Sequence, residues 1–226
     1  MKFLSLQRRI MLSARLIAYS SALKMLALLG NRTVLHDFCQ TTAEATPSLI
    51  VTICAAVNAV GNSLPPFLVF PRINFKQHML KGAPQGSTDA TSGSGWMKSE
   101  TFVEFLHYFW HFIKQTRCSC EHPVLLCLDK HDIHISIASL ISIASQNLAK
   151  ENGIHLLTFP PHCSHKLPPL DRSVFGPLKR QYSAGCDAWL LKNPGKPLTI
   201  YDISEVLGYA FPRAFSPTNI TKNADS

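Results

Sequence analysis

The sequence predicts an α/β domain in which strands alternate with helices, and three observations support this fold class. The 226 residues are 46% hydrophobic and 16% charged, which is enough apolar material for a core and too little charge for a disordered chain. Short apolar runs rich in β-branched residues alternate with longer runs whose apolar residues repeat at helical spacing. No run reaches the roughly eighteen apolar residues of a transmembrane helix, so we expect no membrane partner.

The first predicted elements are two strands joined by a turn. Residues 49–57 are nearly all apolar, as in a strand buried on both faces. Residues 58–62 carry a turn signal, and residues 63–70 predict the second strand of a hairpin. Pro65 and Pro66 cannot donate hydrogen bonds to a ladder, so we expect them at a sheet edge or a bulge. Residues 82–95 are rich in Gly, Ser, Thr and Pro and predict a loop.

Helices and strands then alternate. Ser99 is a suitable N-cap for a helix to about residue 114, in which Phe102, Leu106 and Phe109 repeat on one face. Residues 124–128 predict a short buried strand and residues 136–150 a helix that stops at Asn152-Gly153. Residues 154–158 predict a further strand, and residues 174–191 predict the last helix of this part of the chain.

The positive charge of the chain is unevenly distributed. The net charge is +8, but residues 1–36 hold six basic residues and no acid, leaving 16 basic against 14 acidic residues in the remainder. This basic leader resembles a mitochondrial presequence in composition, and the alternative, which we favour, is the poorly defined leader of a truncated chain. We expect a leader over 1–46, a folded domain over 47–192 and a C-terminal extension over 193–226.

Two clusters of polar residues are candidates for a functional site. Asp129 directly follows the strand predicted over 124–128, and His131, Asp132 and His134 follow it closely. The carboxyl ends of strands are the usual ligand-binding edge of an α/β sheet, although an Asp there also suits a turn.

The second cluster lies in residues 159–171. His162, Cys163 and His165 could ligate zinc or provide a reactive thiol, but a fourth ligand at zinc-finger spacing is missing and the chain has no CxxC pair. Asp171 suits a helix N-cap as well as a site. The seven cysteines are an odd number without a disulfide pattern, which favours a reducing, intracellular compartment.

These clusters resemble motifs of one family. Residues 126–136 resemble the second-aspartate motif, and residues 159–179 the third-aspartate motif, of the DDE-1 superfamily of endonucleases, the transposase-derived proteins of the pogo, Tigger and jerky type. Residues 57–66 and 94–97 resemble further landmarks of that family in the same order. The resemblance covers about residues 47–185 and identifies the chain as an N-terminally truncated member.

The resemblance implies an RNase-H-like mixed sheet flanked by helices, with DNA as the partner and the nucleus as the location. It implies that Asp129 and Asp171 are two of three carboxylate ligands for Mg²⁺ or Mn²⁺, in a site that cleaves phosphodiesters with two metal ions. His131, His134 and Lys179 would support these ligands or face phosphates.

The sequence departs from the family pattern at its first aspartate. That residue belongs on the first strand, upstream of residue 49, where residues 1–36 hold no acid and neither Asp37 nor Glu44 matches the motif. Ile133 and Pro168 are smaller departures, and the helix-turn-helix domains of longer relatives are absent. We therefore expect a fold lacking its first central strand and a loss of catalysis. The alternatives are a domesticated, non-catalytic DNA- or protein-binding module, or a zinc- or thiol-dependent protein.

Overall fold

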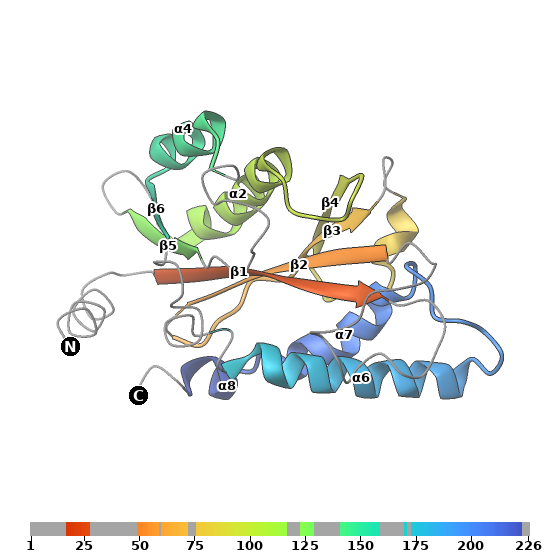
Figure 1. The fold of residues 1–226 in the computed structure, drawn as a ribbon. Coiled ribbons are helices and arrows are strands. Elements are labelled where there is room, and N and C mark those ends of the chain that lie inside the picture. Colours follow the sequence, from red (N-terminus) through yellow and green to blue (C-terminus); the bar gives the residue numbers. More distant parts are fainter. Residues whose placement is uncertain are drawn as a thin grey trace.

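The computed structural model has three layers, with helices on both faces of one mixed sheet (Figure 1). It describes residues 17–27, 49–58, 60–71, 76–116, 123–128, 141–158, 170 and 173–222, and for 17–27 and 49–50 the backbone alone. The α/β fold class and the mixed sheet flanked by helices are therefore confirmed.

The sheet has six strands in the order β4-β3-β2-β1-β5-β6. β1 (Ile17–Ala27), β2 (Leu49–Asn58) and β3 (Phe67–Pro71) form an antiparallel meander. β4 (Thr88–Ser92) runs parallel to β3 at one edge. β5 (Val124–Leu128) runs parallel to β1, and β6 (Ile154–Thr158) runs parallel to β5 at the other edge.

The expectation that the first central strand is lacking is wrong. β1 is an 11-residue strand in the middle of the sheet, between β2 and β5. Its sequence, rich in Ala, Ser, Leu and Met, has little local preference for a strand, and pairing on both sides outweighs that weakness. Residues 17–27, which the sequence assigned to a basic leader, thus complete the sheet.

One face of the sheet packs against α2 (Ser99–Ile113) and α4 (Ile143–Glu151). The stripe predicted in α2 is buried there, with Phe109 and Leu106 fully inaccessible. Cys54 and Ala56 of β2 point to this face, as do Leu126 and Leu128 of β5. We call this the α2 face.

The opposite face packs against α6 (Phe175–Lys192) and α7 (Ile203–Ala214), and the short helix α8 (Pro217–Thr221) follows. Val51, Ile53, Ala55 and Val57 of β2 point to this side, so the strand is buried on both faces as its sequence predicts. Residues of α7 such as Leu207 belong to the same hydrophobic cluster. We call this the α6 face.

Glycines bring α7 into direct contact with the segment after η1 (Gln77–Leu80). A Cβ on Gly208 would overlap the carbonyl oxygen of Gly82 and lie 3.1 Å from its carbonyl carbon. Gly82 has a φ of +78°, and a Cβ there would lie 2.9 Å from Cα of Glu205. The Ser204 hydroxyl donates a hydrogen bond to the carbonyl of Met79 beside this contact. Backbone therefore packs on backbone, which only glycine permits.

Three local predictions need correction. The loop predicted over 82–95 contains β4, because a polar edge strand lacks the apolar pattern by which strands are recognised. The helix predicted over 136–150 begins, within the described residues, at Ile143, where the Ser142 hydroxyl accepts a hydrogen bond from the Ser145 amide. Pro65 and Pro66 precede β3, which lies inside the sheet, so they are outside its ladder without marking an edge.

In the part of the chain that the structure describes, no helix combines the length and the apolar character needed to cross a membrane.

Candidate functional site

The candidate functional site is at the edge of the sheet where β5 ends. β5 ends at Leu128, so Asp129 is the next residue along the chain, as the sequence predicts. Leu128 is paired with Ser20 of the central strand β1 and with Thr158 of β6. The parallel strands therefore bring three distant segments together at the edge where α/β proteins bind ligands.

Two residues that flank Asp171 in sequence lie on the α6 face of the sheet. Leu170 and Val174, which flank Asp171 in sequence, are buried in the same cluster as Cys127, two residues before Asp129. Ala55, the partner of Ser21 in the β1–β2 ladder, belongs to that cluster too. Because residues paired across a ladder lie on the same side of a sheet, the Ser21 position belongs to the α6 face.

Most of the predicted site residues lie outside the described residues. These are Asp129, His131, Asp132, His134 and Asp171, and the same holds for the alternative zinc or thiol cluster of His162, Cys163 and His165. What the structure describes is the frame around them: the end of β5, the register of β1 and the start of α6. In this frame, Cys127 and Leu170, the described residues nearest the two aspartates on that side, belong to one cluster on the α6 face.

Lys179 is the predicted site residue that the structure does describe. It is exposed on α6 next to Arg180, which is also exposed. The first turn of α6 holds no acidic residue, and the N-terminal end of a helix carries a partial positive charge. This end of α6, within a few residues of Asp171, is therefore electropositive.

The residues present do not fit the pair of divalent ions that the resemblance implies. Two such ions need a set of carboxylate ligands, and the family takes one of them from the first strand. β1 occupies that place, and none of its eleven residues is Asp or Glu. No group of three or more His, Cys, Asp or Glu side chains within metal-binding reach occurs among the described residues. Among the described residues, the central strand therefore supplies no carboxylate.

The thiol alternative depends on Cys163, which lies outside the described residues, and the described cysteines are a separate matter. Cys127, two residues before Asp129 in sequence, is buried, and burial raises the pKa of its thiol to about 11. Burial also raises the pKa of the Cys54 thiol far above its ordinary value. A thiol with a raised pKa is neutral at physiological pH, and the neutral form neither binds metal nor attacks an electrophile.

Sequence reasoning did not single out Ser20 and Ser21, whose positions in the register lie beside the end of β5. Within a run rich in Ala, Ser and Leu nothing marks them, and they become visible only through the pairing of Ser20 with Leu128. The alternation of faces along β2 supplies the second signal, because Ala55 and Ala56 face opposite sides. A search of residues 1–36 for an acidic residue could not have found these positions, because only the pairing of β1 with its neighbouring strands defines them.

Comparison with known proteins places this frame in a family. The model of the DDE superfamily endonucleases matches residues 47–223. A relative from Cochliobolus lunatus, named "MFS-type transporter clz9", is 36% identical over 176 residues, which is 75% of this chain. The chain spans 18% of that relative.

Solved structures of the Mos1 transposase are also similar. The paired-end complex with the left transposon end gives a TM-score of 0.46 at 10% identity over 98% of this chain. The Mos1 mariner paired end complex with Mn gives 0.46 at 13% identity over 98%. The strand transfer complex gives 0.47 at 11% identity over the full chain. This chain spans about three fifths of each, 59%, 58% and 59% respectively.

With TM-scores below 0.5, these likenesses add nothing to the assignment, which rests on the family model. That model spans most of the chain, including the segments that follow β5 and precede α6. The chain therefore belongs to the DDE superfamily endonuclease family.

Proposed function

We propose that this domain binds DNA at the electropositive start of α6 and does not cleave it. The observation that carries the proposal is the register of β1: Ser20 pairs with Leu128, and no residue of β1 is acidic. The central strand therefore has serines, and no carboxylate, beside the end of β5.

The loss of cleavage follows from the chemistry of two-metal catalysis. One ion activates the attacking oxygen and the other stabilises the leaving oxygen, which requires both ions about 3.5–4 Å apart. Carboxylates hold such ions by neutralising their charge, and a serine hydroxyl supplies none. With Asp129 and Asp171 as the remaining ligands, we expect the site to hold at most one of the two ions.

Retained DNA binding is supported by charge. Lys179 and Arg180 are exposed next to the positive end of the α6 dipole, and such an end is suited to phosphate oxygens. The family acts on nucleic acid, so DNA is the expected partner and the nucleus the proposed location. We expect binding to depend on the phosphate backbone and to show little sequence preference.

Restoring the carboxylate tests the loss of cleavage. The assay is nicking of supercoiled plasmid in Mg²⁺ and in Mn²⁺. We expect no nicking by the natural chain and metal-dependent nicking by Ser21→Asp, abolished when Asp129→Ala is added. The matched control is Ser20→Asp, because its partner Ala56 lies on the α2 face. Nicking by the natural chain, lost in Asp129→Ala, would overturn the proposal.

Charge reversal on α6 tests DNA binding separately. We expect Lys179→Glu with Arg180→Glu to weaken binding of a labelled duplex in fluorescence anisotropy and to reduce the salt slope by about 2. Lys192→Glu, at the opposite end of α6, is the control and should change neither. Equal effects of the two charge reversals, or no binding by the natural chain at low salt, would refute this part and favour a protein-binding module.

A further inference from the structure

We propose that β6 and α4 form a docking site for an extended, acidic peptide segment of another protein, which adds to the sheet as a further strand. The site lies at the end of the sheet beyond β5 and on the α2 face. It is thus separate from the α6 face of the proposed DNA site, and the inference does not depend on that proposal.

The first argument is that β6 is the last of the described strands at this end of the sheet. β6 pairs with β5 along all five of its residues, from Val124↔Ile154 to Leu128↔Thr158. Among the described strands none pairs with its outer side, since β6 ends the sheet order. An edge strand presents unpaired N–H and C=O groups, and these are a template for another strand.

The second argument is that β6 has none of the charged residues or prolines that protect many sheet edges. Its sequence, Ile-His-Leu-Leu-Thr, has no Pro, Lys, Asp or Glu, and Leu157 keeps 43% of its surface exposed. The opposite edge strand, β4, is polar and carries a carboxylate, Asp89. Charge on an edge strand discourages pairing with another chain, so the two edges of this sheet differ in kind.

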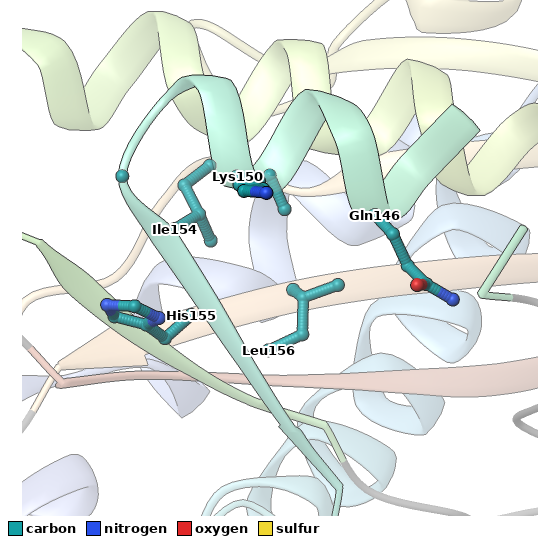
Figure 2. A pocket seen from close by; sticks show the side chains of 7 residues that line it. Gln146, Lys150, Ile154, His155 and Leu156 are labelled. Atoms are coloured by element: carbon teal, nitrogen blue, oxygen red, sulfur yellow. The ribbon is translucent and has the colours of Figure 1, made fainter. Parts of the chain in front are cut away.

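The third argument is a groove beside β6. It has a volume of about 220 Å³ and lies between β6 and α4, with Ile154 and Leu156 of β6 and Gln146 and Lys150 of α4 around it (Figure 2). An apolar cavity of about 150 Å³ holds a benzene molecule, whereas pockets for drug-sized ligands begin at about 300 Å³. The groove therefore suits one large apolar side chain of a strand laid along β6.

The charge of the groove indicates which polar side chain the bound peptide should carry. Lys150 is exposed on the wall of the groove, and none of the described residues that line the groove is acidic. Complementary charge fixes the register of a partner and raises its association rate, so an acidic side chain beside the apolar one suits this groove.

A second copy of this chain fits less well than a peptide. Symmetric pairing through β6 would place the same surface on both sides, so Lys150 of one copy would face the patch that holds Lys150 of the other. A five-residue strand also offers far less than the roughly 1,200 Å² that a stable interface buries. A short acidic strand avoids the charge conflict, and a weak peptide contact does not need the area of a stable dimer.

The test uses a defined probe, fluorescein-labelled Thr-Leu-Thr-Glu-Thr-Leu, with Leu, Glu and Leu on one face. Its partner probe has Lys in place of Glu. With the full chain we expect saturable binding of the acidic probe in fluorescence anisotropy and at least ~10-fold weaker binding of the basic one. We expect Lys150→Glu to reverse this preference, which loss of folding could not do.

A matched pair of tryptophans tests the groove itself. Gln146→Trp places a bulky ring at the groove and should weaken the acidic probe by about 10-fold or more. Asn147→Trp adds the same ring to an exposed neighbour outside the groove and should leave binding unchanged. Equal effects of the two tryptophans, absence of binding at about 1 mM probe, or dimerisation through β6 in sedimentation would overturn the proposal.

Discussion

The contact of α7 with Gly82 predicts that the same substitution has opposite effects in two helices. Gly208→Ala in α7 places a Cβ against the carbonyl group of Gly82, including a 3.1 Å approach to its carbon. The carbonyl oxygen and carbon of Gly82 are backbone atoms, so they cannot rotate away from the added Cβ as a side chain could. Gly176→Ala in α6 places a Cβ in open space, with nothing within 4 Å.

The magnitudes follow from two opposing effects. Replacing Gly by Ala inside a helix gains up to about 1 kcal/mol from helix propensity. Overpacking costs about 1–3 kcal/mol, and a backbone clash belongs at the upper end. We therefore expect Gly208→Ala to lower the free energy of unfolding by about 2 kcal/mol and Gly176→Ala to raise it by about 0.5 kcal/mol.

The assay is urea denaturation of both variants beside the natural chain, followed by circular dichroism. For a chain of this size, 2 kcal/mol corresponds to a fall in Tm of roughly 4–8 °C. Hydrogen exchange in residues 76–83 should rise in Gly208→Ala, since this segment rests on α7. If Gly208→Ala proves as stable as Gly176→Ala, α7 does not dock on this segment and the reasoning fails.

Three further predictions concern single side chains. Burial, and to a smaller extent the negative charge of Glu104, raises the pKa of Asp89 from 3.8 to about 6. The protonated carboxyl is therefore favoured in the folded state, and the stability that this gives is complete below pH 3.8 and lost as the pH rises through 6. The full pKa shift corresponds to about 3 kcal/mol, and solvent screening of this half-buried group reduces its effect on stability to roughly 1 kcal/mol. In urea denaturation, Asp89→Asn should therefore raise the free energy of unfolding by about 1 kcal/mol at pH 8 and hardly change it at pH 4. An equal increase at both pH values would contradict this account. Tyr108→Phe removes a hydrogen bond of 2.7 Å to the Pro65 carbonyl and should cost about 1 kcal/mol in the same assay, with a neutral result arguing that water replaces the hydroxyl. Phe109→Ala empties a site with no solvent exposure and should cost about 3–5 kcal/mol, so a loss below 1 kcal/mol would show that this part of the core is not packed as described.

Elements with a strong local pattern were predictable from sequence. β2, β5 and β6 are apolar and bounded by turn signals, and α2 repeats its aromatic residues at helical spacing. In each, the local preference agrees with the final environment, so a single sequence suffices. α6, predicted over 174–191, spans Phe175–Lys192.

Two strands were not predictable because their stability comes from distant residues. β1 contains Lys24 and many helix-favouring residues, and it becomes a strand by pairing with β2 and β5. β4, Thr-Asp-Ala-Thr-Ser, is polar because it lies at an edge, and only its ladder with β3 defines it. The two strands were missed because they are stabilised by pairing with residues far away in the sequence, which a short stretch of sequence cannot show.

The candidate site was predictable in its location and not in its composition. The rule that ligands bind at the carboxyl ends of strands led to Asp129, and the structure ends β5 one residue before it. The roles of Asp129, Asp171, His131 and His134 remain predictions, since these residues lie outside the described ones. The serines of β1 depend on register, which is fixed by pairing across most of the domain.

The position of β1 has a consequence for synthesis on the ribosome. Ile17 pairs with Leu125 in β5, more than a hundred residues later, whereas its antiparallel neighbour β2 begins at Leu49. β5 ends at Leu128 and β2 at Asn58. At about 5–20 residues per second, the β1–β2 pair therefore waits roughly 4–14 s for β5 to be made. During that interval one side of the central strand is an open edge, so a chaperone that shields extended backbone should raise the yield of folded chains. The yield of translation in vitro, with and without added chaperone, measures this dependence.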